Sequence, residues 1–270
     1  MLTNLHTHTS FCDGKSTPEE MILSAIEKGF GSIGFSGHGH TSFDESYSIT
    51  DTDGYIAEIK RLKEKYSKEI QVYLGAEEDM LDYVKREDYD YIIGSSHYIY
   101  FDGKYLEIDG DSDTFQNAAE QFGGDYLALA DMYYKQFSEY IVRRKPDIVG
   151  HFDLVTKYDE KYFNTFLNNP EYDRIAEKYF LYALESQCIF EVNTGAIFRG
   201  YRTMPYPKEN LLHILKKENG KITFSADAHC PDALDFKFSE SARFLWDIGF
   251  REFYGLYDGK FRPFDLKSIF

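Results

Sequence analysis

Short apolar runs alternate with amphipathic stretches along the whole chain. Seven runs are bounded by turn residues and are short enough for buried strands; they lie at residues 2–8, 32–36, 71–75, 91–95, 147–150, 188–192 and 221–226. Helical periodicity separates most of them, at about residues 17–29, 54–68, 125–144, 171–186, 208–217 and 239–246. Strands that alternate with helices are typical of a parallel sheet with helical crossovers.

The first helix carries an explicit start signal. Ser16-Thr17-Pro18-Glu19-Glu20 combines a capping residue, an early proline and two acidic residues, and Gly29 marks the expected end. Residues 98–124 are rich in Asp and Gly and are expected to form an insertion before the long helix. No linker or repeat divides the chain, so residues 1–270 are expected to form one domain.

Seven strand-and-helix units fit an α/β fold, either a distorted, TIM-like (β/α)7 barrel or an open doubly wound sheet. In both architectures ligands bind at the carboxyl ends of the strands. A functional site is therefore expected at that edge, whichever architecture the chain adopts.

The histidines gather at this edge. Seven of the eight follow a predicted strand, and two carboxylates, Glu77 and Asp227, occupy equivalent positions. The seven are His6, His8, His38, His40, His97, His151 and His229, so Asp227 shares its strand end with His229 and Glu77 alone fills a strand end that has no histidine. His213 lies inside a helix and is expected to be an ordinary buried histidine. Convergence of residues from distant parts of the chain predicts a site that binds several metal ions.

The spacing of the first pair supports this prediction. Side chains alternate along a strand, so His6 and His8 project to the same side and can bind one ion. Imidazoles and carboxylates without thiolates favour Zn, Mn or Fe(II). Cys12 is accordingly expected to be a buried packing residue.

Charge and cysteine content narrow the classes of partner. The chain has 46 acidic and 30 basic side chains and a net charge of −16, which disfavours nucleic acids and anionic membranes. The three cysteines are odd in number and widely spaced, and no apolar run is long enough for a membrane span. These features predict a soluble, cytoplasmic protein and leave its oligomeric state open.

Six short motifs together resemble a known family. They are H-T-H at 6–8 with Asp13, S-G-H-G at 36–39, G-A-E at 75–77, S-S-H at 95–97, G-H-F-D at 150–153 and A-D-A-H at 226–229. Each motif is weak, but the ordered set is similar to the polymerase and histidinol phosphatase (PHP) family over nearly the whole chain. Within that family the chain most resembles the stand-alone histidinol-phosphate phosphatases.

The resemblance implies a distorted (β/α)7 barrel with three divalent metal ions at the carboxyl ends of the strands. It places one ion on His6, His8, Glu77 and Asp227. A second would be held by His97 and His151, with Glu77 as the bridge. The third would be held by Asp13, His38 and His229. Some members have histidine at the position of Asp13, and matching S-G-H-G to the family pattern favours His38 over His40.

The resemblance further implies hydrolysis of a small phosphate monoester, L-histidinol phosphate, in histidine biosynthesis. We expect a metal-activated hydroxide beside Glu77 to attack phosphorus, because metal ions neutralise phosphoryl oxygens and acidify bound water. His40 is the candidate proton donor or phosphate contact.

Other residues after the strands are candidates for binding and orientation. Lys157, Arg199 and Arg202 are candidate phosphate contacts. Asp153 and Asn193 are expected to orient ligands or substrate. Tyr98, Phe198 and Tyr201 are candidates to stack on an imidazole-bearing substrate.

Two other functions remain open. A different small substrate is compatible with the same site, since relatives of the family include phosphotyrosine phosphatases and nucleotide phosphodiesterases. A non-catalytic protein stabilised by metal is the second alternative, although closed structural zinc sites have four ligands and are commonly rich in thiolates.

Overall fold

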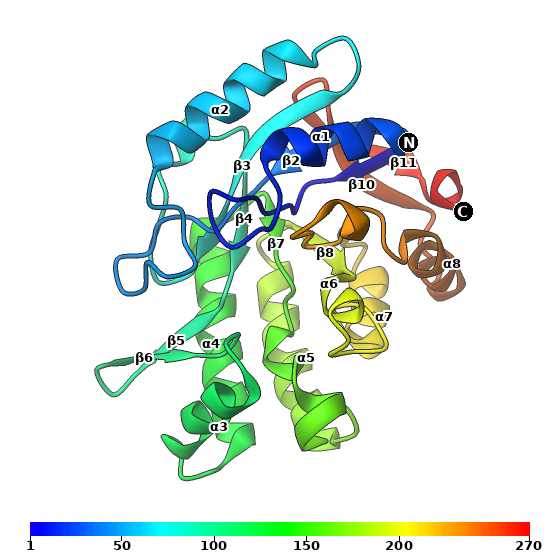
Figure 1. Cartoon of the computed structure of the whole chain (residues 1–270). Coiled ribbons are helices and arrows are strands. Elements are labelled where there is room, and N and C mark those ends of the chain that lie inside the picture. Colours follow the sequence, from blue (N-terminus) through cyan, green and yellow to red (C-terminus); the bar gives the residue numbers. More distant parts are fainter.

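Seven parallel strands form a nearly closed barrel in the computed structural model, which describes residues 1–270 (Figure 1). The strands pair in the order β1-β2-β3-β4-β7-β8-β9. Their bounds are β1 Leu2–Asn4, β2 Phe30–Phe35, β3 Gln71–Asp79, β4 Tyr91–Ser95, β7 Ile148–Val149, β8 Ile189–Asn193 and β9 Lys221–Ser225. The TIM-like α/β barrel predicted from the sequence is confirmed, and the open sheet is excluded by the closure described next.

The barrel closes through residues just beyond β1. Thr7 forms a parallel bridge to Ala228, with hydrogen bonds from the His8 amide to the Ala228 carbonyl and from the Ala228 amide to the His6 carbonyl. Strand β1, at Leu2–Asn4, is shorter than the strand predicted over residues 2–8. The Asn4 side chain interrupts it, because its Oδ1 accepts a hydrogen bond from the His6 amide at 3.0 Å.

Strand β3 is longer than the sequence pattern indicated. Its first half, through Leu74, pairs with β2, and its second half, from Gly75, pairs with β4. The acidic residues Glu77, Glu78 and Asp79 are therefore part of the strand, although their polarity predicted an end at Gly75. Glu77 lies inside the sheet rather than after it.

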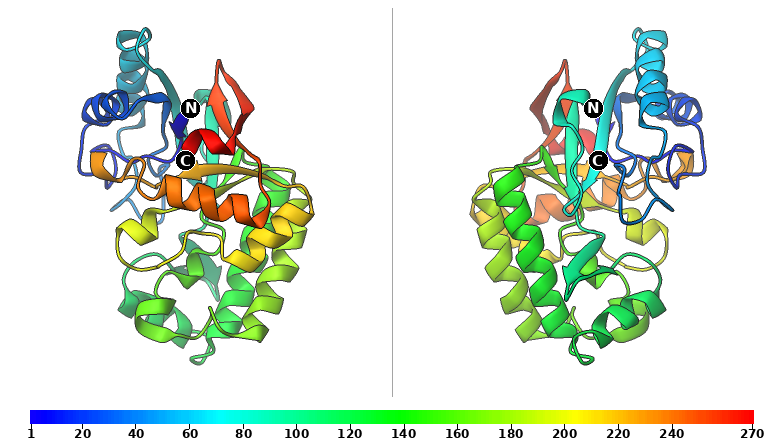
Figure 2. Two further views of the ribbon diagram at one scale, coloured as in Figure 1. Left: turned by 90° about the vertical axis from the view of Figure 1, so that its right-hand side faces the viewer. Right: turned by 90° about the vertical axis from the view of Figure 1, so that its left-hand side faces the viewer.

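Helices cover the outside of the barrel. The main ones are α1 Pro18–Glu27, α2 Thr52–Lys65, α4 Tyr126–Arg144, α5 Pro170–Leu184, α7 Glu209–Lys217 and α8 Phe238–Ile248, with the short α6 at Gly195–Phe198. Figure 2 shows α4 and α5 side by side along one flank. Helix α1 begins as predicted: the Thr17 side chain accepts a hydrogen bond from the Glu20 amide, and the Glu20 carboxylate accepts one from the Thr17 amide.

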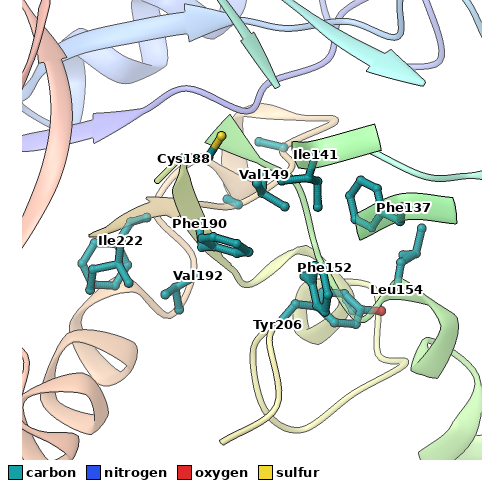
Figure 3. Close-up of a cluster of buried hydrophobic side chains, with 14 of the residues drawn as sticks. Phe137, Ile141, Val149, Phe152, Leu154, Cys188, Phe190, Val192, Tyr206 and Ile222 are labelled. Carbon is teal, nitrogen blue, oxygen red and sulfur yellow. The ribbon is translucent and has the colours of Figure 1, made fainter. Parts of the chain in front are cut away.

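The core lies between the strands and this helical layer. Val149, Phe190 and Ile222, from three neighbouring strands, belong to one buried cluster with Phe137 and Ile141 of α4 (Figure 3). All five side chains are buried. Because helices and strands bury their apolar faces against each other here, the carboxyl ends of the strands can carry polar residues.

Two antiparallel hairpins lie outside the seven-stranded sheet. Strands β5 Tyr98–Phe101 and β6 Lys104–Glu107, followed by α3 Ser112–Glu120, occupy the region predicted to be an insertion. Strands β10 Glu252–Tyr257 and β11 Lys260–Asp265 form the second hairpin, and Leu256 packs with Leu5, Tyr73 and Tyr91 in the barrel. The helices include none that combines the length and apolarity needed to cross a bilayer.

Candidate metal centre

Imidazoles and carboxylates from six strand ends meet inside one rim of the barrel. The carboxylate of Glu77 lies at their centre. Its Oε2 atom is 3.1 Å from His6 Nε2, 3.4 Å from His8 Nε2 and 3.0 Å from His38 Nδ1. Its Oε1 atom is 3.0 Å from His151 Nε2 and 3.3 Å from His97 Nε2.

Four overlapping groups have ligand atoms within 4.8 Å of one another. They are His6 with Glu77 and His151; His6 with His8 and Asp227; His38 with Glu77 and His97; and His8 with Asp13, His38 and His229. All nine predicted ligands thus come together. The grouping differs in detail from the expected assignment, because His8 and His38 each present their two ring nitrogens to different neighbours.

The exposure of the side chains increases from one side of the centre to the other. The side chains of His6, His8 and Glu77 are fully buried, whereas His229 is 23% exposed and Asp13 is 36% exposed. His229 Nε2 lies 2.9 Å from Asp13 Oδ2. The centre is therefore most open to solvent on the side of Asp13 and His229.

Several polar atoms in the buried part have no hydrogen-bond partner. His6 Nε2, His8 Nε2 and Glu77 Oε2 are buried and unpaired, although they face one another. Leaving a buried polar group unsatisfied costs about 1–3 kcal/mol. A neutral imidazole nitrogen and a carboxylate oxygen both present lone pairs, so a proton or a metal ion between them satisfies both. The residues present therefore fit divalent metal ions.

The electrostatics lead to the same conclusion. Burial acts to lower the pKa of His6, but the carboxylates of Glu77 and Glu191 outweigh burial and raise it to about 10. Burial acts to raise the pKa of Glu77, but the imidazoles of His6 and His97 outweigh it and hold this pKa well below its usual range. The protein groups by themselves thus draw positive charge into the centre.

Glu191, which sequence reasoning missed, fixes the orientation of two predicted ligands. Its Oε2 atom lies 2.9 Å from His6 Nδ1, so the opposite ring nitrogen faces Glu77, and its Oε1 accepts a hydrogen bond from the His151 amide. Ser225 and Asn193 also donate to this carboxylate. The signal was a charged residue inside the apolar run of strand β8.

Asp79 is a second residue that sequence reasoning missed. Its Oδ2 atom accepts a hydrogen bond from the His97 amide at 3.0 Å and lies 3.5 Å from His97 Nδ1. The predicted strand ended at residue 75, so Asp79 lay outside every predicted element and was not singled out.

A pocket of about 230 Å³ opens at the exposed side of the centre. Five predicted ligands line it together with Asp109, Lys157 and Arg199; the lining residues are Asp13, His38, His97, Asp109, Lys157, Arg199, Asp227 and His229. Arg199 Nη2 donates to Asp227 Oδ2 at 2.8 Å, and Lys157 Nζ donates to Asp109 Oδ1 at 2.6 Å. Two of the three predicted phosphate contacts therefore lie in the pocket.

Arg202, the third predicted phosphate contact, does not line the pocket. Its side chain is 1% exposed, and its Nη1 atom donates to Thr156 Oγ1 at 2.9 Å and to Asp153 Oδ2 at 3.3 Å. The guanidinium also covers the Tyr206 ring. Asp153 in turn accepts a hydrogen bond from the Lys208 amide, so this group fixes neighbouring loops instead of facing substrate.

Three other sequence-based interpretations differ from the structure. The His40 side chain is 47% exposed, does not line the pocket and has Glu45, at 4.0 Å, as its ion-pair neighbour. His213 is exposed and lies beside Glu209 one helical turn away, so it is not a buried histidine. Cys12 is partly exposed, and its sulfur lies 3.5 Å from His8 Nδ1, because the loop after β1 folds back on that histidine.

The aromatic candidates lie in different places. Tyr98 is buried and its hydroxyl donates to Asp44, whereas Phe198 is exposed and packs edge-on against Phe236. Tyr201 packs against Tyr158. None of the three lines the 230 Å³ pocket.

Comparison with known proteins gives a consistent result. The family model described as "PHP domain" matches residues 4–195, more than half of the chain. A protein of Bacillus subtilis named histidinol-phosphatase is 28% identical over 250 residues, which cover 83% of this chain and 92% of that protein. A protein of Schizosaccharomyces pombe named "probable histidinol-phosphatase" is 26% identical over 272 residues, covering 90% of this chain and 86% of the other.

A solved structure supports the likeness at the level of the fold. Histidinol phosphate phosphatase from Lactococcus lactis, in complex with Zn, L-histidinol and phosphate, superposes with a TM-score of 0.71 at 20% identity. The match covers 96% of this chain and 98% of that one. The two proteins therefore share their architecture over almost their full length.

Proposed function

This chain belongs to the PHP domain family, and we propose that it is a metal-dependent phosphomonoesterase that hydrolyses L-histidinol phosphate to L-histidinol and phosphate. The observation that carries the proposal is the pocket in which Lys157 and Arg199 face predicted metal ligands. Relatives that match most of the chain carry the name of this activity, and their coverage leaves no large part of the chain unaccounted for.

The proposal assigns the nine clustered side chains to three divalent ions, Zn, Mn or Fe. It assigns His6, His8 and Asp227 to one ion, and Asp13, His38 and His229 to another. It assigns His97, His151 and Glu77 to the remaining ion, since Glu77 Oε1 lies 3.3 Å and 3.0 Å from the Nε2 atoms of these histidines. Glu77 Oε2 also faces His6. Zinc is bound in the solved Lactococcus relative. When bound, such ions neutralise phosphoryl oxygens, lower the pKa of water and stabilise the departing alkoxide.

The chain's own residues bind and orient the phosphate. Lys157 is 9% exposed, so its ammonium is held in the pocket instead of moving freely in solvent. Arg199 presents its guanidinium beside Asp227 and His229. A planar guanidinium and an ammonium on one pocket provide donors for two phosphate oxygens. The proposal gives no catalytic role to His40 or Arg202, since neither side chain reaches this pocket.

A metal-reconstituted assay tests the proposal. Purified protein loaded with Zn, Mn or Fe(II) is supplied with L-histidinol phosphate, phosphotyrosine, AMP and simple alkyl phosphates, and phosphate release is measured for each. We expect the highest kcat/KM for L-histidinol phosphate, and metal analysis of the same samples counts the bound ions. Equal or faster turnover of phosphotyrosine or AMP would assign the site to another small substrate. Retained metal without hydrolysis of any ester would favour a non-catalytic metal protein.

A further inference from the structure

One carboxylate in the pocket has no place in the metal centre. Asp13, Asp109 and Asp227 are the three pocket carboxylates, and the first and last belong to the groups that could hold ions. Asp109 belongs to none of these groups. It follows strand β6, in the segment expected to be an insertion. A role other than metal binding is therefore needed to explain why this carboxylate lines the pocket.

Asp109 lines the pocket, is held by neighbouring residues and has one side-chain oxygen without a partner in the protein. Lys157 Nζ donates to its Oδ1 at 2.6 Å and to its backbone carbonyl at 2.8 Å. The Tyr158 hydroxyl also donates to that carbonyl, and the amide of the preceding Ile108 donates to the His97 carbonyl at 2.7 Å. The side chain is 30% exposed, and Oδ2 accepts no hydrogen bond within the protein.

We propose that Asp109 determines substrate specificity by accepting the protonated amine of the substrate on Oδ2, while its Oδ1 holds Lys157 toward the phosphate. This inference rests on the proposed function. In L-histidinol phosphate the amine is on the carbon next to the one that carries the ester, so it enters the same small pocket as the phosphate. Charges then alternate along the pocket: phosphate, Lys157, Asp109 and the substrate ammonium.

The charge pattern explains how a site built for phosphate tolerates a cation. Lys157 and Arg199 would repel an ammonium group that entered the pocket alone. A carboxylate between Lys157 and the amine reverses the sign of that interaction, and charge-assisted hydrogen bonds are roughly twice as strong as neutral ones. An alkyl phosphate without the amine gains nothing from Asp109, so this residue separates the two kinds of substrate.

The Asp109→Asn variant tests this inference, because asparagine keeps an oxygen for Lys157 but carries no charge. The metal-loaded enzyme is assayed with L-histidinol phosphate and with 3-(imidazol-4-yl)propyl phosphate, which differs only by lacking the amine. We expect kcat/KM for L-histidinol phosphate to fall about tenfold or more, mainly through KM, and kcat/KM for the analogue to change less than about threefold. Asp109→Glu is expected to restore part of the selectivity.

A matched control removes the same charge from the same segment. Glu107→Gln lies two residues away and does not line the pocket, so it should leave the ratio between the two substrates unchanged. An equal loss on both substrates in Asp109→Asn would overturn the inference, because Asp109 would then act only by holding Lys157. The inference would also be overturned if Glu107→Gln lowered the ratio of kcat/KM between the two substrates as much as Asp109→Asn does. The amine would then be attracted by the negative charge of the whole segment and not by Asp109 itself.

Calorimetry with products separates this inference from the proposed function. L-histidinol and inorganic phosphate are titrated separately into metal-loaded wild type and Asp109→Asn. We expect the variant to bind L-histidinol about tenfold more weakly and phosphate as wild type does. If wild type fails to hydrolyse L-histidinol phosphate yet its binding of L-histidinol depends on Asp109, the proposed function fails and the amine site stands. Equal binding of L-histidinol by both proteins overturns the amine site.

Discussion

At the scale of single residues, the centre is defined by buried atoms that lack partners. Glu77 faces five imidazoles, yet its Oε2 accepts no hydrogen bond. Burying a carboxylate among imidazoles is unfavourable unless positive charge accompanies it. The arrangement is therefore stable only with protons or metal ions between these groups, which makes Glu77 the residue most sensitive to substitution.

Replacing Glu77 by Gln keeps the shape of the side chain and removes the charge that faces two predicted metal positions. We expect metal content to fall and kcat/KM for L-histidinol phosphate to drop about 100-fold or more, since even partners outside a coordination shell contribute about 10- to 100-fold. Elemental analysis and the phosphate-release assay measure both quantities. His213→Gln, on an exposed helix position, serves as the control. A Glu77→Gln protein with full metal content would contradict the assignment.

Glu191 should act on metal affinity without touching the ions. Its carboxylate orients His6 and fixes the backbone at His151, so Glu191→Gln weakens the orientation of two ligands at once. We expect metal affinity to fall about 10- to 100-fold, measured by competition with a chelator of known affinity. Glu209→Gln removes a surface charge elsewhere and should leave the affinity unchanged. If the metal affinity of Glu191→Gln equals that of wild type, this carboxylate does not orient the ligands and contributes only to packing.

The sequence identified the clustered side chains better than the residues around them. His6, His97 and His229 were found because the carboxyl ends of parallel strands meet at one rim. Glu191 and Asp109 were missed, because their roles depend on contacts between segments far apart in the chain. His40 follows the same strand as His38, but its side chain turns outward, which spacing alone could not reveal.

At the scale of elements, strand and helix order was predictable and strand ends were not. The six main helices were located by their apolar periodicity and turn residues, whereas α3, inside the predicted insertion, and the short α6 were not predicted. The end of β1 depends instead on the side chain of Asn4, and the end of β3 depends on β4, which provides partners for Glu77 and Asp79. Contacts with distant residues decide where a strand stops, so a prediction based on local polarity was wrong at both ends.

Helix α1 offers a test of local structure that is independent of the metal centre. The Thr17 hydroxyl accepts a hydrogen bond from the Glu20 amide, one of the otherwise unpaired donors of the first turn. We expect Thr17→Ala to lower the free energy of unfolding by about 1 kcal/mol, measured by urea denaturation, with metal content and kcat/KM unchanged. Thr17→Ser keeps the hydroxyl and should lose less. Equal loss in both variants would show that the methyl group, not the cap, stabilises the helix.

At the scale of the whole molecule, a strongly acidic chain contains a centre that attracts cations. The net charge of −16 opposes the approach of any anion, including a phosphate ester. Lys157 and Arg199 offset two of the three carboxylates that line the pocket, and bound divalent ions would make its charge positive. Metal ions thus serve two purposes in the proposed enzyme: they make the site attractive to substrate and they neutralise buried carboxylates.

Removing the metal should consequently affect stability as well as activity. Chelation leaves Glu77, Asp227 and the unpaired imidazole nitrogens of His6 and His8 without the cations that satisfy them. An ion present at about 100 times its dissociation constant stabilises the native state by about 2.7 kcal/mol, so we expect the thermal midpoint to fall by about 5–10 °C. Differential scanning calorimetry with and without chelator measures the shift, and added Zn should restore it together with activity. Because Glu77→Gln is expected to bind fewer ions, its midpoint should move less on chelation. A metal-free wild-type protein with an unchanged midpoint would show that the unpaired atoms of this cluster are satisfied by something other than metal.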